Sequence, residues 1–287
     1  MNPGAFRPAE RLVLGYVAIT TLLALFRWSA QPAIAWVLGA HVMIFVLMWL
    51  LRHADAGPPG QGLRTVAPLL LLGAFYPAID ILNNFGAAAV HDAAIQHWEL
   101  RLFGGAVSRT WWQAAPSRFW STVLHAVYFA YYPIVLGPPI LFLAWGRRAA
   151  AERSVLWLMA TFLSCYLVFL LYPVAGPYYE YPRPDAAFLD NWAARLVYAT
   201  LSKGSAYGAA FPSSHVAATL VAAAAAWFGS RKLGAVLAGP ALLLTIGVVY
   251  CQMHYAVDAV AGVLVAGVVV WLGWRREREA GTAARRG

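Results

Sequence analysis

Charged side chains are scarce in this sequence. Asp, Glu, Lys and Arg make up 11% of its 287 residues, whereas an average soluble domain carries roughly 25%. Hydrophobic residues make up 61% and form long runs, which excludes an ordinary water-soluble domain and predicts several membrane-spanning helices. The net charge of +9 then indicates arginines in cytoplasmic loops, so we expect a membrane and not a nucleic acid as the partner of this charge.

Cysteine and lysine are also rare. The two cysteines, Cys165 and Cys251, lie in apolar runs, so we expect small buried side chains and no disulfide. Lysine occurs only twice while Ala, Gly and Arg are abundant, a composition that suggests a GC-rich bacterial genome and hence a bacterial inner membrane. We expect no cleavable signal peptide, because the first apolar run lacks a small-residue cleavage site and a second run follows at once.

The apolar runs predict an all-α integral membrane protein, a helical bundle of about eight spans within a range of six to eight. Pro68 and Pro77 weaken the third run. The fourth is expected to kink at Pro133, Pro138 and Pro139. The expected spans are residues 11–27, 33–51, 65–84, 119–145, 154–172, 212–229, 233–250 and 254–274.

The distribution of positive charge predicts that both termini are cytoplasmic. When the eight spans alternate across the membrane, the inner segments hold 14 of the 21 Lys and Arg residues and the outer segments hold 7, in the direction of the positive-inside rule. This arrangement brings residues 86–117, 173–210, 212–215 and 254–258 to the same, extracytoplasmic face.

Two histidine motifs stand at the two ends of one predicted pair of helices. The first reads Pro-Ser-Ser-His and ends at His215, and the second reads His-Tyr-Ala-Val-Asp and runs from His254 to Asp258. In a helix that begins near Met253, His254 and Asp258 share one face, so the carboxylate can hold one imidazole proton and leave the other nitrogen nucleophilic. At the start of the earlier helix, free backbone N–H groups favour a phosphate, and His215 can act there as acid and base.

Other interpretations of these residues stay open. The histidines could be solvated interfacial side chains with no chemical role. His215, His254 and Asp258 could form a three-ligand metal site, although no His-Glu-x-x-His pattern or acidic cluster accompanies them. Ser213 and Ser214 could be nucleophiles, but their position suits helix capping and backbone donation to a phosphate better. We therefore expect no metal and no other cofactor.

Together the two motifs resemble the phosphatidic acid phosphatase type 2 superfamily of phosphotransferases, over about residues 120–274. Ser214 replaces the glycine of the superfamily's Pro-Ser-Gly-His motif, and Gly247 and Val248 stand where its third motif has Ser-Arg. Of the first motif, Arg183 and the following proline are present, but Gly176 occupies the lysine position. The residues that match the two histidine motifs are Pro212, Ser213, His215, His254 and Asp258.

The absent arginine and lysine count against a plain phosphatase. Within the superfamily the sequence looks most like the inositol phosphorylceramide synthase branch and is similar to the sphingomyelin synthases. That branch also lacks the arginine and has a loop like residues 172–179. The resemblance implies transfer of a phospho-headgroup from a glycerophospholipid to a lipid alcohol such as ceramide, with a phospholipid donor and the alcohol as partners. His254 then attacks phosphorus, Asp258 orients it, and His215 protonates the departing alcohol and later activates the acceptor.

Two alternative functions remain. The chain could be a lipid phosphate or polyprenyl diphosphate phosphatase, or a lipid-binding or transport protein without turnover. The missing arginine at 248 favours the transferase, and the intact residues His215, His254 and Asp258 disfavour a catalytically inactive scaffold. The oligomeric state is not indicated.

Candidate substrate-binding residues lie in the loop before His215 and at the helix start. Arg183 is the first candidate for the phosphate because of its Arg-Pro context, and Lys203 is the second because it is close to the helix start. Each could instead only meet lipid headgroups at the interface, and interfacial tyrosines are common in any membrane protein. The candidate set is Arg183, Lys203, Tyr178, Tyr179, Ser213 and Ser214.

The remaining polar residues are assigned mainly to structure. Asp80 could equally bind the acceptor or pair with another helix. His125 and Tyr128 are expected to fill the core. The amphipathic stretch Asp92–Phe103 is expected mainly to anchor the chain at the interface. We divide the chain into N-terminal transmembrane helices (1–90), an interfacial amphipathic segment (91–118), a phosphotransferase transmembrane core (119–274) and a basic cytoplasmic tail (275–287).

Small residues mark the packing between the two motif helices. Ala222–Ala226, Gly262 and Gly267 allow membrane helices to approach closely, where packing takes over from the hydrophobic effect. We expect this tight contact to hold His215 against His254.

Overall fold

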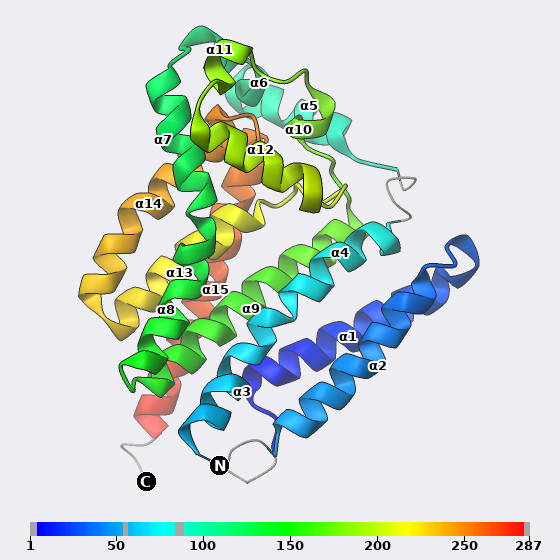
Figure 1. Ribbon diagram of the computed structural model, residues 1–287, viewed down its shortest axis with the longest axis vertical. Helices are drawn as coiled ribbons and strands as arrows, with labels where there is room; N and C mark the ends of the chain where they lie inside the picture. The colour runs from blue at the N-terminus through cyan, green and yellow to red at the C-terminus, as the bar shows by residue number, and fades with distance from the viewer. Residues whose placement is uncertain (1–4, 54–56, 84–88, 284–287) are drawn as a thin grey trace.

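The computed structural model describes residues 5–53, 57–83 and 89–283, which are helical apart from the connecting segments (Figure 1). These residues form no β-strand, and extended backbone pairs in an isolated bridge between Val174 and Ala209. The helices are α1 (Pro8–Phe26), the 3₁₀ helix η1 (Trp28–Ala30), α2 (Ile34–Leu51), α3 (Pro58–Leu70), α4 (Leu72–Leu82), α5 (Asp92–Phe103), α6 (Val107–Ala114), α7 (Arg118–Phe129), α8 (Tyr131–Ala144), α9 (Arg148–Leu171), α10 (Pro177–Glu180), α11 (Ala186–Leu189), α12 (Trp192–Gly204), α13 (Ser214–Gly229), α14 (Arg231–Tyr250) and α15 (Ala256–Ala283).

Seven of the described helical segments are long and apolar enough to cross a membrane, so the protein is an all-α integral membrane bundle. They are α1, α2, α3 with α4, α7 with α8, α9, α14 and α15 up to Glu279. The eighth predicted span corresponds to α13, which has 16 residues and is therefore only about 24 Å long, less than the hydrocarbon thickness of about 30 Å. In Figure 1, α13 begins beneath α12, so its first turn lies inside the protein.

The third and fourth predicted spans each consist of two helices. The third is interrupted at Leu71, between its two prolines. The fourth is interrupted at Ala130, because Pro133 has no N–H to donate to the carbonyl of Phe129 four residues earlier. The expected kink is thus present, but it lies before all three prolines, two of which, at 138 and 139, are accommodated inside α8.

Small side chains let α13 pack closely against α9, α14 and α15. Ala222, Ala225 and Ala226 are fully buried. On α15, a Cβ added to Gly262 would lie 2.6 Å from the carbonyl oxygen of Ser213, so only glycine permits this approach. The expectation for Gly267 was wrong, because a Cβ there would meet open space.

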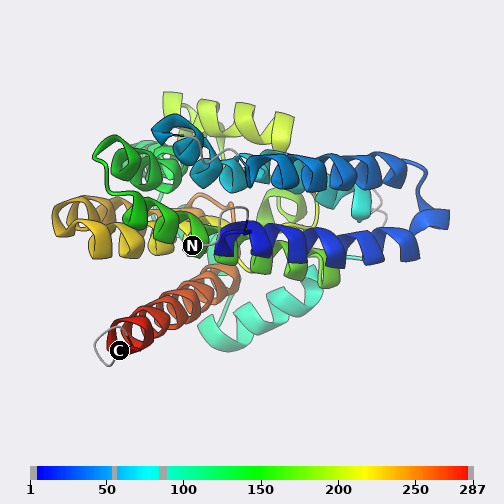
Figure 2. The same cartoon turned by 90° about the horizontal axis from the view of Figure 1, so that it is seen from below.

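One end of the bundle carries all the segments that hold the sequence motifs. Helices α5, α6, α10, α11 and α12 gather there with the first turns of α13 and α15 (Figure 1). The beginning of α1 and the end of α15 lie at the opposite end (Figure 1). Viewed from below, α12 and α15 lie on opposite sides of the molecule (Figure 2). The histidine motifs are therefore at one common end.

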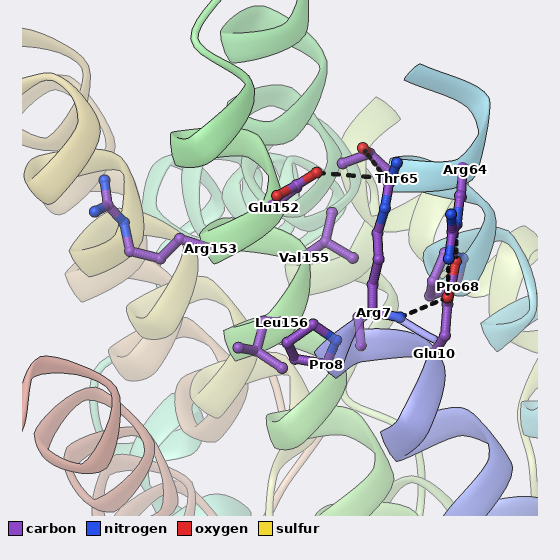
Figure 3. Close-up of a pocket in the computed structure, with 11 residues that line it drawn as sticks. Arg7, Pro8, Glu10, Arg64, Thr65, Pro68, Glu152, Arg153, Val155 and Leu156 are labelled. Carbon is purple, nitrogen blue, oxygen red and sulfur yellow. Dashed lines mark hydrogen bonds and ion pairs between the residues drawn. The ribbon is translucent and has the colours of Figure 1, made fainter. Parts of the chain in front are cut away.

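A buried ionic cluster fastens the opposite end (Figure 3). Glu10 of α1 accepts hydrogen bonds from both Nε and Nη2 of Arg64 on α3, at 2.6 and 2.9 Å, and both side chains are almost fully buried. Arg7 donates to Thr65 at 3.0 Å and pairs with Glu152 of α9 at 3.3 Å. Because these charges are paired, they can be buried at the junction of α1, α3 and α9.

Candidate active site

The two motif histidines lie side by side, with ring centroids 5.7 Å apart. His215 is the second residue of α13, which begins at Ser214, and the hydroxyl of Ser213 caps this helix by accepting from the N–H of Val216 at 3.3 Å. The N–H of Ser213 also donates to the backbone oxygen of Asp258 at 3.0 Å. The start of α13 is thus bonded directly to the helix that carries the second motif.

His254 lies just before α15 rather than within it. The expected helix start near Met253 was wrong, because α15 begins at Ala256. Asp258 is then in the first turn, where its Oδ2 accepts from the N–H of Tyr255 at 2.9 Å, one half of a capping box. The same Oδ2 lies 3.4 Å from Nδ1 of His254. Asp258 therefore fixes the helix start and contacts the histidine with one oxygen.

Burial keeps the imidazole of His254 neutral. Its side chain is 5% exposed, and that of Asp258 is fully buried. Burial lowers the pKa of His254 to about 4, while a hydrogen bond with the backbone of Ala210 acts in the opposite direction. At neutral pH the ring accordingly has a lone pair available for attack on phosphorus.

Two aromatic rings flank His215. The ring of Tyr128 stacks against it at 4.9 Å with its hydroxyl 3.4 Å from Nε2, and the ring of Tyr131 lies at 4.5 Å. We expected Tyr128 to fill the core, and it is buried, but it also forms part of the site. The buried Nδ1 of His215 has no hydrogen-bond partner among the described residues.

Two buried carboxylates of α5 anchor the segments around His254. Asp92 accepts from the N–H groups of Ala175 and Gly176 at 2.7 and 2.8 Å, and from the hydroxyl of Tyr255 at 3.0 Å. The sequence suggested that the α5 segment mainly anchors the chain at an interface. These hydrogen bonds show that it does more than that. Through Asp92 it connects the loop after α9 to the second motif.

Glu99 is the second of these carboxylates, and it is fully buried. Its Oε1 accepts from the N–H of Ala256 at 2.8 Å, at the first residue of α15. Burial raises the pKa of Glu99, while hydrogen bonds from the backbones of Ala256 and Ser108 lower it. Since both partners lie in the first turn of a helix, one carboxylate stabilises the N-terminal ends of α15 and α6. Asp92 and Glu99 are seven residues apart on one helix face, a pattern that could have identified them.

A side-chain bridge holds the turn between α14 and α15. Gln252 has a positive φ of 58°. Its side chain accepts from Nε1 of Trp112 at 2.9 Å and donates to the oxygen of Pro182 at 2.8 Å. Both cysteines, one of which is Cys251 in the same turn, are free and buried.

The histidine pair faces a cavity of about 40 Å³ that shares lining residues with two larger spaces. On one side is a space of about 390 Å³ with a mixed polar and apolar lining, here called the polar space, whose wall includes Asp80 and Lys203. On the other side is a mainly apolar groove of about 300 Å³ between α3, α4, α8, α9 and α12, which reaches His215. Tyr76 and Leu201 line all three spaces.

The predicted binding residues divide among these spaces. Tyr178 and Tyr179 line the cavity of the two histidines, and Ser214 lines the apolar groove. Lys203 lines only the polar space. Arg183 lines none of the three, and its guanidinium lies 5.9 Å and 5.3 Å from the ring centroids of Tyr178 and Tyr198. Within the described part of the chain, no Arg or Lys lines the histidine cavity.

The three-ligand metal interpretation has no geometric support. Among the described residues, no group of three His, Cys, Asp or Glu side chains is placed to hold a metal ion. Glu99 and Asp258 each keep one buried oxygen without a hydrogen-bond partner among these residues. No third side chain among them completes a metal site with these two carboxylates.

The comparison with protein families decides the family. The sequence matches the PAP2 superfamily over residues 93–272, more than half of the chain. This chain belongs to the PAP2 superfamily. The match begins within α5 and includes both histidine motifs, so the PAP2 region contains the helix whose carboxylates bond to the second motif. PAP2 proteins are generally phosphatases or phosphotransferases, and this chain is an enzyme of that type.

The superfamily predicted from the motifs is thus confirmed, and the inositol phosphorylceramide synthase branch stays a prediction. Comparisons with curated proteins and with solved structures found no match.

Proposed function

We propose that this PAP2 enzyme is a transferase that moves a phosphorylated headgroup from a glycerophospholipid to a lipid alcohol such as ceramide. The observation that carries the proposal is the position of the histidine cavity between two larger spaces of different character. The apolar groove suits lipid tails, and the polar space, with Asp80 and Lys203 on its wall, suits a hydroxylated headgroup. Two such spaces beside one histidine pair favour an enzyme whose acceptor is a second organic substrate and not water.

The packing at the end of α14 supports the same choice. Val248, at the position of the superfamily's phosphate-holding arginine, is fully buried in a cluster with Leu124 and Tyr128. A Cβ at Gly247 would lie 3.2 Å from the side chain of Leu124. Apolar packing therefore fills the place where a phosphatase of this superfamily is expected to hold its substrate by an arginine.

The chemistry requires two balanced steps. First, with the anionic phosphate bound and His215 in its protonated form, a nitrogen lone pair of His254 forms a bond to phosphorus and the bond to the departing diacylglycerol oxygen breaks. His215 donates its proton to that oxygen and becomes neutral. Asp258 balances the positive charge that develops on the attacking ring. Second, the acceptor hydroxyl gives its proton to His215, its oxygen bonds to phosphorus, and the phosphorus–nitrogen bond breaks. Both histidines then return to their starting states.

Backbone groups are the main candidates for holding the phosphoryl oxygens. The N–H groups of Ser214 and His215 belong to the first turn of α13, and no backbone hydrogen bond among the described residues uses them. Such a helix start attracts an anion. Tyr178 can donate its hydroxyl from the cavity wall, whereas the hydroxyl of Tyr179 donates to Oγ of Ser205 at 2.9 Å. Arg183 and Lys203 contribute positive charge from farther out.

We place the site on the extracytoplasmic face of a bacterial inner membrane, with both termini in the cytoplasm. The excess of Lys and Arg in the segments assigned to the inside supports this orientation. The gathering of the motif-bearing segments at one end of the bundle is consistent with it (Figure 1).

Purified protein in detergent with EDTA tests the function. Wild type, His254→Ala and the control His97→Ala, an exposed histidine of α5, would each receive fluorescent ceramide with phosphatidylinositol, phosphatidylcholine, phosphatidylethanolamine or phosphatidic acid. We expect a phosphosphingolipid from wild type and His97→Ala, and none from His254→Ala.

Two results would overturn this proposal. Release of phosphate from phosphatidic acid without any ceramide product would identify a phosphatase. Loss of the wild-type activity in EDTA, with recovery on addition of zinc, would replace the covalent histidine by a metal centre.

A further inference from the structure

A second large groove lies at the end of the bundle opposite the catalytic histidines. It measures about 620 Å³ and is bounded by α1, α9 and α15. Its apolar lining includes Leu12, Trp157, Ala160 and Leu272. Because these helices span the membrane, the apolar part of the groove lies at the depth of lipid tails.

The close contact of α9 with α15 forms one wall of this groove. Trp157 is 3% exposed, and a Cβ at Gly273 would lie 2.2 Å from its ring. The indole therefore occupies the space that a side chain at 273 would need. This wall of the groove is thus a closely packed contact of the folded bundle.

Positive charge is concentrated where the groove meets the end of the bundle. Arg11, Arg153 and Arg276 line it together with one carboxylate, Glu277. Arg153 pairs with Glu277 at 3.2 Å. Figure 3 shows Arg153 pointing away from the buried cluster around Arg7, so that cluster does not neutralise it.

Two of the arginines have no partner in the described residues. Neither Arg11 nor Arg276 forms an ion pair or a side-chain hydrogen bond there, and the Nε of Arg153 is buried without a partner. Since Glu277 balances only Arg153, the groove carries a net positive charge beside an apolar lining. That combination fits a ligand with one anionic group and a long hydrocarbon chain.

We propose that this groove binds one anionic phospholipid from the leaflet opposite the catalytic site. Its phosphate lies between Arg11 and Arg276, and an acyl chain follows Leu12, Trp157 and Leu272. The lipid is distinct from the substrate, because it is held at the far end of the bundle. A zwitterionic lipid of equal chain length lacks the net charge that the two arginines require.

Native mass spectrometry of the delipidated full-length protein tests this binding. Phosphatidylglycerol and phosphatidylcholine with identical chains would be titrated separately. We expect the double variant Arg11→Gln/Arg276→Gln to bind phosphatidylglycerol about 30-fold more weakly than wild type, from about 1 kcal/mol for each arginine. Arg275→Gln/Arg278→Gln, which removes the same charge from neighbouring exposed positions of α15, is the control and should retain the wild-type affinity.

A variant that fills the groove tests the binding of the acyl chain separately from the binding of the phosphate by the arginines. Ala160→Phe fills the apolar lining and should displace phosphatidylglycerol while leaving the thermal midpoint of the lipid-free protein unchanged. Equal affinity for both lipids, an equal loss in the control pair, or unaltered binding in Ala160→Phe would each overturn the proposal. Displacement of the lipid by soluble glycerol phosphate at similar concentration would also overturn it, because the site would then recognise a free anion.

Discussion

Replacing Asp258 with asparagine removes one negative charge from the candidate site with little change in shape. In the structure, Oδ2 of Asp258 accepts from the N–H of Tyr255 at 2.9 Å and lies 3.4 Å from Nδ1 of His254. An asparagine oxygen can still accept from the same N–H, so α15 should begin at the same residue. The substitution therefore tests the charge of Asp258 separately from its structural role.

The expected loss follows from the distance between the two side chains. A full positive charge on His254 at 3.4 Å from the carboxylate interacts by about 5 kcal/mol at an effective dielectric constant of about 20. If about half of that charge has developed in the transition state, about 2.5 kcal/mol is lost, which corresponds to a decrease in kcat of about 70-fold. The KM should change little, because the neutral ring of the free enzyme does not need this charge.

Steady-state turnover of a fluorescent phospholipid by the purified variant measures this effect. Asp190→Asn, an exposed carboxylate at the same end of the protein, serves as the control. Asp258→Ala should lose activity and also unfold at lower temperature, because it leaves a buried N–H unpaired at a cost of about 1–3 kcal/mol. Wild-type kcat in a stably folded Asp258→Asn would refute the electrostatic role and leave Asp258 a helix cap only.

Three further predictions concern packing, pH and stability. Gly262→Val should lower the thermal midpoint and the activity, since its Cβ would lie 2.6 Å from the backbone oxygen of Ser213. Gly267→Val, whose side chain would enter open space, should change neither. Equal effects of the two substitutions would contradict this packing. The acidic limb of log kcat/KM against pH should have its midpoint well below pH 6.5. Burial lowers the pKa of His254 to about 4, and only protonation of its ring blocks the attack on phosphorus. A midpoint at pH 6.5 would argue against a buried nucleophile. Glu10→Gln should cost about 3–5 kcal/mol in unfolding assays by removing the carboxylate charge that compensates buried Arg64, and Glu279→Gln, in an exposed pair, should cost little.

Hydrophobic length allowed the spans to be predicted closely from the sequence. The expected spans 33–51 and 233–250 correspond to Ile34–Leu51 and Arg231–Tyr250, because a membrane core requires about 20 apolar residues wherever they occur. The helix start at the first histidine motif could also be predicted from local sequence, because a proline and a serine cap fix the start of α13 at Ser214.

Contacts between distant helices were not predictable in the same way. Asp92 meets Ala175 across 83 positions, and Glu99 meets Ala256 across 157. A helical pattern shows that two acidic residues share a face, but it does not show which element that face meets. The burial of Asp92 and Glu99 shows that α5 packs into the protein and is more than an interfacial anchor. For the same reason Tyr128 was assigned to the core, although its ring also stacks on the first-motif histidine.

Local geometry at the second motif also differed from expectation. The i, i+4 spacing predicted the contact between His254 and Asp258, but it assumed a helix through both residues. The turn before α15 instead makes this contact, while the carboxylate of Asp258 caps the helix by accepting from the N–H of Tyr255. Capping depends on which side chain reaches the free N–H group, and several residues in this stretch could have served.

The most direct test of the proposed mechanism is detection of a phosphorus–nitrogen bond on His254. A ³²P-labelled phospholipid would be mixed with wild type, His254→Ala and His215→Ala, quenched in alkali within milliseconds to seconds, and digested for mass spectrometry. We predict a base-stable, acid-labile label on His254 in wild type and none in His254→Ala. With a donor whose leaving group needs no proton, the label should accumulate in His215→Ala because the acceptor is no longer activated. Turnover without any label on His254, or a label on another residue, would contradict the account.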